Sequence, residues 1–258
     1  MEPVLLLAFV LGFAVSVLSG MLGIGGGILL APALLYLPVL LGMEGIGMAE
    51  VTGLTIVQSL TASTTAGYRH QREGFVDRQL VIWMGGALAL TAVAGSILSS
   101  VLPGEALKLV FAGLAAAAAG LMLLPRAKED DVVPEKIAFD RPKAVGIASG
   151  VGLLGGLVGQ GGSFILIPLM LHVLKLPTRV VIGTSLILVL LSSLAGFVGK
   201  FATGQVPVVL AVCLVLGAVP GALIGSSVGL KTRPDRLRLL LAGVVALGAS
   251  GIGIDALS

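Results

Sequence analysis

Long apolar runs without a single charged residue constrain this sequence most strongly. Leu80–Ser100, Val180–Gly199 and Val206–Gly229 are each long enough to cross the ~30 Å hydrocarbon core of a bilayer as a helix rising ~1.5 Å per residue. The chain is 57% hydrophobic and only 11% charged, so lipid must solvate most of its exterior. The runs lack the alternation of apolar and polar residues found in the strands of membrane barrels. A helix, moreover, forms all of its backbone hydrogen bonds within itself, as the membrane interior requires. The sequence therefore predicts an all-α, polytopic integral membrane protein.

The chain consists of two halves that resemble each other in sequence. Ser19–Gly27, followed by Pro32, matches Gly155–Ser163, followed by Pro168. Further along each half, Gly53–Thr55 pairs with 183–185, position 74 with 204 and positions 95–96 with 225–226. Positions paired in this way are called equivalent below. We expect a first transmembrane repeat at residues 1–124, a charged cytoplasmic linker at 125–143 and a second transmembrane repeat at 144–258.

Each half begins with an apolar run that a glycine cluster divides into two arms. The arms are Pro3–Ser19 and Ile28–Leu41 in the first half, and Ala144–Leu154 and Phe164–Leu174 in the second. At ~1.5 Å per residue they reach roughly 16–26 Å, less than the hydrocarbon thickness. Three full-length spans follow in each half, which predicts eight to ten helices in all. The expected spans are about Val51–Tyr68, Leu80–Ser100, Ala106–Leu124, Val180–Gly199, Val206–Gly229 and Leu237–Ile254.

The distribution of basic residues predicts the topology of these segments. If each divided run is a hairpin that returns to its starting side, 14 of the 16 Lys and Arg residues share one side, and only Lys108 and Lys200 lie on the other. If each run is one broken span, the division is nine to seven. Because basic loops stay cytoplasmic, the hairpin arrangement is favoured. The two halves are then inverted-topology repeats of a multi-pass protein of the cell (inner) membrane, with both termini on the non-cytoplasmic side.

The composition argues against several classes of function. Cys213 is the only cysteine, and His70 and His172 lie in different halves, so neither a cysteine metal site nor a catalytic pair is supported. Lysine, arginine, aspartate and glutamate all fall near predicted loops or span ends, and we expect no charged group in the membrane interior. We therefore expect no enzyme, no cofactor, no metal and no nucleic-acid partner. The expected partners are a small anion and membrane lipid, and the sequence leaves open whether the protein forms a homodimer.

The glycine clusters are the candidate binding elements. Their glycines can turn backbone N–H groups into a cavity, and the arms that begin at Ile28 and Phe164 would direct helix N-termini at the same place. Close helix packing is the alternative explanation for such glycines. The residues expected to bind substrate, drawn from both halves, are Gly23, Gly25, Gly26, Gly27, Thr52, Thr55, Gln58, Gly159, Gln160, Gly161, Gly162, Ser163, Thr184 and Ser185.

The doubled glycine pattern resembles that of the TauE/SafE family. The segments that carry the resemblance are Gly20–Gly27 with Pro32, Gly156–Ser163 with Pro168, Gly183–Leu186, Gly74–Asp77 and Gly204–Val206. The resemblance implies a secondary transporter that moves sulfite, sulfoacetate, thiosulfate or a similar organosulfur anion outward by alternating access. Two alternatives stay open, a passive anion channel of the same fold and a membrane assembly protein that transports nothing.

Overall fold

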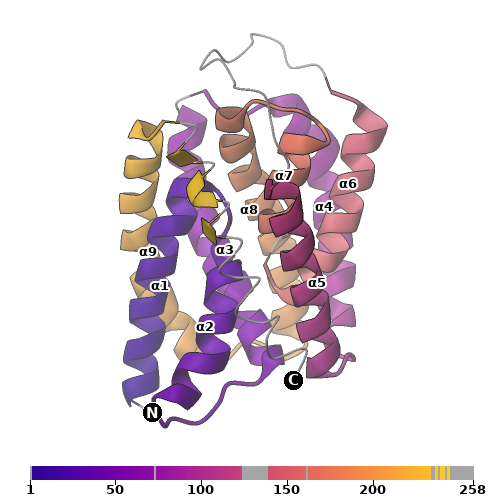
Figure 1. Cartoon of the computed structure of the whole chain (residues 1–258). Coiled ribbons are helices and arrows are strands. Elements are labelled where there is room, and N and C mark those ends of the chain that lie inside the picture. The colour runs from indigo at the N-terminus through magenta and orange to yellow at the C-terminus, as the bar shows by residue number, and fades with distance from the viewer. Residues whose placement is uncertain are drawn as a thin grey trace.

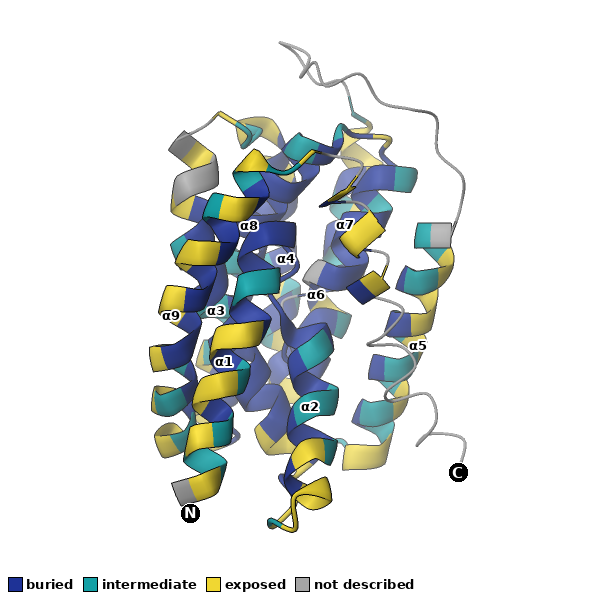
Figure 2. Cartoon of the chain, turned by 60° about the vertical axis from the view of Figure 1, so that its left-hand side comes forward, coloured by how far each residue is buried: buried dark blue, intermediate teal, exposed yellow. Residues whose placement is uncertain are grey.

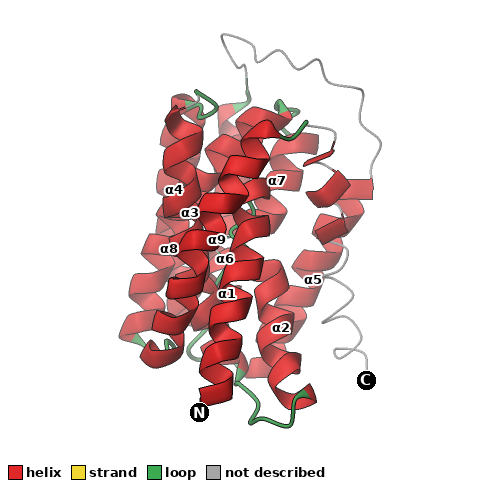
Figure 3. Cartoon of the chain, turned by 90° about the vertical axis from the view of Figure 1, so that its left-hand side faces the viewer, coloured by secondary structure: helices red, strands yellow, loops and turns green. Residues whose placement is uncertain are grey.

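The computed structural model describes residues 2–72, 74–123, 139–160, 162–233, 236–237, 239–241 and 243–244. These residues form α-helices joined by short connections, and no strand occurs among them (Figure 3). The nine helices of the described chain are α1 (Glu2–Leu22), α2 (Gly27–Leu40), α3 (Met48–Arg72), α4 (Arg78–Leu98), α5 (Gly104–Leu123), α6 (Arg141–Val158), α7 (Ser163–His172), α8 (Thr178–Ala202) and α9 (Val208–Lys231).

Both divided runs fold into hairpins with a long first arm and a short second arm. In Figure 1, α1 rises from the N-terminus and α2 returns to the same lower end, whereas α6 and α7 form the corresponding pair at the upper end. The 14-residue α2 and the 10-residue α7 are short, as expected. The 21-residue α1 is about 31 Å long and exceeds the expected arm.

The first arms are longer than predicted because glycines at their ends pack inside helices. Helix α1 continues past Ser19 to Leu22, and Gly20 lies in it against Ala222 of α9. Helix α6 continues past Leu154 to Val158, and Gly156 lies in it against Ala92 of α4. These glycines serve close helix packing and do not break the helix.

The two ends of the bundle differ in charge. The upper end, here called the basic end, carries the α3–α4 connection, the start of α6 and the end of α9, with Arg78, Arg141, Lys143 and Lys231. The lower end, here called the α1 end, carries the start of α1, the α2–α3 connection and the α8–α9 connection. The α1–α2 hairpin has its open end at the α1 end, and the α6–α7 hairpin has its open end at the basic end.

Two long helices, α3 and α8, form the centre of the bundle. They contact each other, and α4 and α9 pack beside them. Five described helices, α1, α4, α5, α8 and α9, are long and apolar enough to cross a membrane, and α8 is the most buried of them inside the protein. The expected span in α3 is helical but is not one of these five, because α3 is rich in hydroxyl and amide groups. Residues 51–59 of α3 are all buried, so protein and not lipid surrounds this polar stretch (Figure 2).

The outer helices present apolar side chains to lipid and small residues to each other. Leu6 on α1, Leu90 on α4 and Leu216 on α9 are more than half exposed, as lipid-facing residues are. Toward the interior, α1 packs closely on α9 and α4 on α6. Both pairs consist of one helix from each half, and glycines allow their backbones to approach.

These close approaches recur at positions related by the sequence repeat. A Cβ atom on Gly20 would meet the backbone of Ala222, and one on the equivalent Gly156 would meet the backbone of the equivalent Ala92. A second matched pair of contacts occurs later in each half. Gly53 packs against the carbonyl of Gln205, and the equivalent Gly183 packs against the carbonyl of the equivalent Phe75. The glycines of one half therefore pack on the other half through matching contacts.

Two expectations concern residues at the edges of the described chain. Most of the predicted linker and most of the predicted span Leu237–Ile254 lie outside the described residues. Helix α6 begins at Arg141 rather than at Ala144, because Asp140 caps it by accepting a hydrogen bond from the backbone N–H of Lys143 at 3.2 Å. Pro142 in the first turn also suits a helix start.

Candidate functional site

The first glycine break lies between α1 and α2, in the interior of the bundle. Gly23, Gly25 and Gly26 adopt left-handed backbone angles, with φ of 75°, 64° and 76°. Such angles favour glycine, and they let the chain reverse within a few residues. The Ser59 hydroxyl of α3 donates a hydrogen bond to the carbonyl of Gly25 at 2.9 Å. The break is therefore anchored to the polar central helix.

Gln58 lies directly against this break. Its side chain is fully buried, and its Nε2 donates a hydrogen bond to the hydroxyl of Ser16 on α1 at 2.8 Å. A Cβ atom on Gly26 would lie 2.7 Å from both amide atoms of Gln58. Among the described residues, the Oε1 atom of Gln58 has no hydrogen-bond partner. Because buried amides normally satisfy both ends, this position is a candidate for contact with a ligand or water.

The second glycine break, between α6 and α7, repeats this geometry. Gly159 ends α6 and Gly162 precedes α7, and both have φ of 73°. Gly161 lies outside the described residues, and the side chain of Ser163 is also outside them. Gly159 fits against the carbonyl of Thr52, just as the equivalent Gly23 fits against the carbonyl of Ile182, the position equivalent to Thr52.

The two breaks meet through Gln160 and Gly27. Gln160 is fully buried, and a Cβ atom on Gly27 would lie 2.5 Å from its Cγ atom. The helices that follow the breaks, α2 and α7, both begin here and run to opposite ends of the molecule (Figure 1). The structure thus brings the two glycine clusters together, although they lie in different halves of the sequence.

Both short helices begin without a side-chain cap. Gly26 and Gly162 occupy the N-cap positions, and neither provides a side chain to accept from the first N–H groups. The first turn of any helix has N–H groups without partners in the helix, and it carries partial positive charge. Gly27, Ile28 and Phe164 are buried, so water outside the bundle does not reach these two helix starts. Such an arrangement can bind an anion through the backbone.

The predicted hydroxyl groups have several different roles. Thr55 donates to the carbonyl of Thr52 at 3.0 Å, and Ser185, its counterpart in the second half, donates to the carbonyl of Ile182 at 2.9 Å. Ser185 also donates to the carbonyl of Gly23 at 3.2 Å and so contacts the first break. Thr184 instead accepts from the backbone N–H of Asp77 at 3.0 Å, in the connection before α4. The structure therefore joins Ser185 to the breaks and gives Thr184 a contact at the basic end.

Lys200 is the residue for which the prediction from the sequence is wrong. Its position after the span Val180–Gly199 predicts a loop residue, but its side chain is fully buried. The long aliphatic stem carries the ammonium group from the last turn of α8 back into the bundle. The contacts of Nζ are Ser99 Oγ at 2.7 Å, Thr52 Oγ1 at 2.9 Å, Gln205 Oε1 at 3.1 Å and the carbonyl of Leu157 at 3.4 Å.

One signal in the sequence could have revealed this site. Lys200 is the only charged residue between Arg179 and Lys231, and Gln205 follows five positions later. A lone lysine inside such an apolar stretch is either a loop residue or an interior charge. The hydrogen bonds from Lys200 to the hydroxyls of Thr52 on α3 and Ser99 at the end of α4 identify it as an interior residue. These partners are distant in the sequence, so the fold is needed to recognise them.

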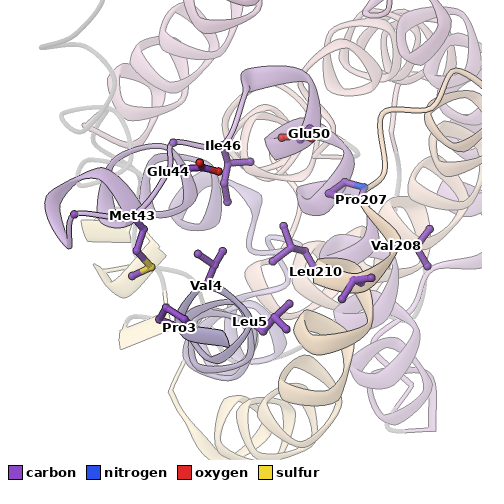
Figure 4. A pocket seen from close by; sticks show the side chains of 13 residues that line it. Pro3, Val4, Leu5, Met43, Glu44, Ile46, Glu50, Pro207, Val208 and Leu210 are labelled. Atoms are coloured by element: carbon purple, nitrogen blue, oxygen red, sulfur yellow. The ribbon is translucent and has the colours of Figure 1, made fainter. Parts of the chain in front are cut away.

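An open cavity of about 770 Å³ lies at the α1 end, separate from the glycine breaks. Figure 4 shows its lining, where Pro3 and Val4 of α1 face Met43, Ile46 and the α8–α9 connection. The charged residues of its lining are Glu44 and Glu50, both carboxylates. Because two negative charges repel an anion, this cavity is a poorer candidate anion site than the glycine breaks.

Comparisons with known proteins identify one family and several membrane transporters. Residues 8–252 match the sequence model of the family described as "Sulfite exporter TauE/SafE". The chain is 25% identical to the probable membrane transporter protein YunE of Bacillus subtilis, covering 92% of this chain and 93% of the relative. It is 24% identical to the probable membrane transporter protein MJ0441 of Methanocaldococcus jannaschii, with 95% and 93% covered. No solved structure matches the chain.

Proposed function

Because this chain belongs to the TauE/SafE sulfite exporter family and its relatives are named probable membrane transporter proteins, we propose that it is a secondary transporter of a small anion. The substrate is sulfite or a related organosulfur anion such as thiosulfate or sulfoacetate. It moves outward across the inner membrane by alternating access. The substrate binds between the two glycine breaks, near the middle of the bundle.

The meeting of two uncapped helix starts is the observation that supports this proposal most strongly. The first turns of α2 and α7 are buried and lack side-chain caps, and Gln160 of one break packs on Gly27 of the other. Helix N-termini from two broken helices provide N–H donors and positive potential without a buried cation. An anion is the ligand class that such a site favours.

The matched contacts between halves support a mechanism of alternating access. The proposed inverted repeats would place the basic end in the cytoplasm and both termini outside, as the distribution of basic residues favours. Because Gly53 contacts Gln205 while Gly183 contacts Phe75, each half closes on the other through equivalent surfaces. Exchange between two arrangements of such equivalent contacts can open one end and close the other.

Transport by the purified protein in proteoliposomes tests the proposal. Wild-type protein should accumulate radiolabelled sulfite with saturation and with exchange of internal for external substrate. Flux without saturation or exchange would indicate a channel of the same fold. Absence of flux with sulfite, thiosulfate and sulfoacetate would contradict the transport function and favour an assembly role.

A single methyl group tests the site itself. Gly27→Ala adds a Cβ atom against Gln160 at a position with ordinary backbone angles. Overpacking typically costs ~1–3 kcal/mol, and we expect uptake to fall about tenfold. Gly113→Ala is the matched control, because Gly113 is exposed on α5 and nothing surrounds its Cβ position. Equal transport by the two folded variants would mean that the glycine break only packs helices.

A further inference from the structure

Lys200 is a buried lysine that the proposed backbone site does not require. Its ammonium group is surrounded by two hydroxyls, one amide and one carbonyl, all of them neutral. No carboxylate among the described residues forms an ion pair with it. Burying a charge without a counter-charge is costly, and neutral acceptors offset only part of that cost. The arrangement therefore has the electrostatics of a site that gains from binding an anion.

The Lys200 cluster adjoins the second glycine break. The Thr52 hydroxyl accepts from Lys200, and the carbonyl of the same residue packs against Gly159. Leu157, whose carbonyl also faces the ammonium group, precedes Gly159 by two positions at the end of α6. A single residue of α3 thus separates the cation from the proposed substrate site, so an anion at the break would lie within the field of Lys200.

The corresponding place in the other half carries different side chains. The positions equivalent to the three side-chain partners of Lys200 hold Ile182, Gly229 and Phe75. These three residues also gather in space, around a cavity of only about 10 Å³ at the basic end. The position equivalent to Lys200 is His70, whose side chain lies outside the described residues. Five residues without a charged side chain and the partly exposed Arg179 line this cavity, so the described part of the basic end repeats the backbone packing without the hydroxyl and amide acceptors found around Lys200.

We infer that Lys200, with the hydroxyls of Thr52 and Ser99, is a charged binding site for a small oxyanion on the path between the second glycine break and the α1 end. The inference rests on the proposed transport function and adds the group that attracts the negative charge. When the oxyanion binds, the ammonium group and the two hydroxyls, rotated from their present acceptors, donate to its oxygen atoms. Charge-assisted hydrogen bonds of this kind are stronger than those to neutral groups.

The test compares Lys200→Met and Lys200→Arg with Lys231→Met in the full-length protein. Lys231 is an exposed lysine at the end of α9, so its substitution controls for the loss of one positive charge. Sulfite is the probe, and both transport in proteoliposomes and binding to the purified protein are measured. We expect Lys200→Met to weaken sulfite binding about tenfold or more, Lys200→Arg to retain part of it, and Lys231→Met to resemble the wild type.

The outcomes separate this inference from the proposed function. Wild-type sulfite transport together with unchanged affinity in Lys200→Met would overturn the inference and leave the transport function standing. Absence of any anion transport by the wild type would overturn both. If Lys200→Met does not fold, Thr52→Val and Ser99→Ala keep the lysine and remove one hydroxyl each. Each should weaken sulfite binding about two- to tenfold, and unchanged affinity in both would overturn the inference.

Discussion

The two ends of the molecule use equivalent backbone packing but opposite side-chain chemistry. At the α1 end, Gly53 contacts the carbonyl of Gln205, whose side chain accepts from the buried Lys200. At the basic end, Gly183 contacts the carbonyl of Phe75, whose side chain helps to close an apolar cluster. A cation is present there too, but Arg179 is partly exposed and its guanidinium carbon lies 5.4 Å from the centroid of the Phe75 ring.

The two ends therefore share their backbone contacts and differ in the side chains that surround those contacts. Close backbone contacts at glycine are common to both ends, so they belong to the architecture. The hydroxyl and amide partners of Lys200 lie at the α1 end, and the equivalent positions of the basic end hold Ile182, Phe75 and Gly229. Among the described residues, the buried lysine therefore lies nearer to the α1 end than to the basic end.

The largest expected effect tests whether the two ends face opposite sides of the membrane. Gly74 and Gly204 are equivalent exposed turn residues with open space around them. In a Cys213→Ser background, Gly204→Cys should react with an impermeant thiol reagent added to intact cells. Gly74→Cys should react only after permeabilisation. Equal labelling of the two cysteines would exclude the inverted relation between the halves.

Substitution of the glycines at the breaks should have the next largest effect. Gly159→Ala introduces a Cβ atom into the carbonyl of Thr52 at a left-handed φ of 73°. Gly23→Ala does the same against Ile182, at 2.9 Å from its carbonyl oxygen. Strain and overpacking together should lower the free energy of unfolding by roughly 2–6 kcal/mol in both variants. Thermal unfolding in detergent measures this, with Gly113→Ala as control. Destabilisation of one variant and not of the other would show that the two breaks are not equivalent.

A double-mutant cycle measures how strongly the α1 end depends on its charge. Ser99→Ala removes the nearest acceptor of Lys200, at 2.7 Å, and should destabilise the protein by about 1.5–3 kcal/mol. In a Lys200→Met background the same change should cost clearly less, because no charge is left without its acceptor. Denaturant unfolding of the four proteins gives the coupling energy, expected at ~0.5–3 kcal/mol. A coupling near zero would mean that Ser99 does not stabilise the buried charge.

The smallest effects should distinguish one end from the other by function. Thr52→Val removes the hydroxyl beside Lys200 with little change of shape, and sulfite affinity should fall about two- to tenfold. Ile182→Val, at the equivalent position of the basic end, should cost only ~0.5–1.5 kcal/mol of stability and leave affinity unchanged. Sulfite binding and thermal unfolding are measured for both variants. Loss of affinity in Ile182→Val would place the binding determinants at both ends.

Much of the architecture could be predicted from the sequence because bilayer helices leave clear signals. Uncharged apolar runs predict the spans of α4, α8 and α9 to within a few positions, and the glycine clusters mark both helix breaks. Helix ends were less predictable. The first arm was expected to stop at Ser19 but reaches Leu22, because Gly20 faces a neighbouring helix and so stays helical.

The left-handed glycines of the candidate site could be predicted from the sequence, but the side chains that contact them could not. Repetition identified Gly23, Gly26, Gly159 and Gly162, and each has the left-handed backbone that only glycine adopts easily. The role of Gln58 beside Gly26 and the contact of Ser185 with Gly23 bring together distant parts of the chain. Such contacts depend on how helices are rotated about their axes, and periodicity alone does not determine that rotation.

Reading the sequence is enough to predict an all-helical membrane protein whose two halves resemble each other, each interrupted by glycines. These properties follow from local composition and from repetition, and neither requires knowledge of distant contacts. The packing of the helices, in contrast, is needed to see that the two breaks meet through Gly27 and Gln160 and that the side chain of Lys200 is buried in the bundle. A lysine near a helix end can extend to water or into the interior, and the hydroxyl acceptors Thr52 and Ser99 select the interior.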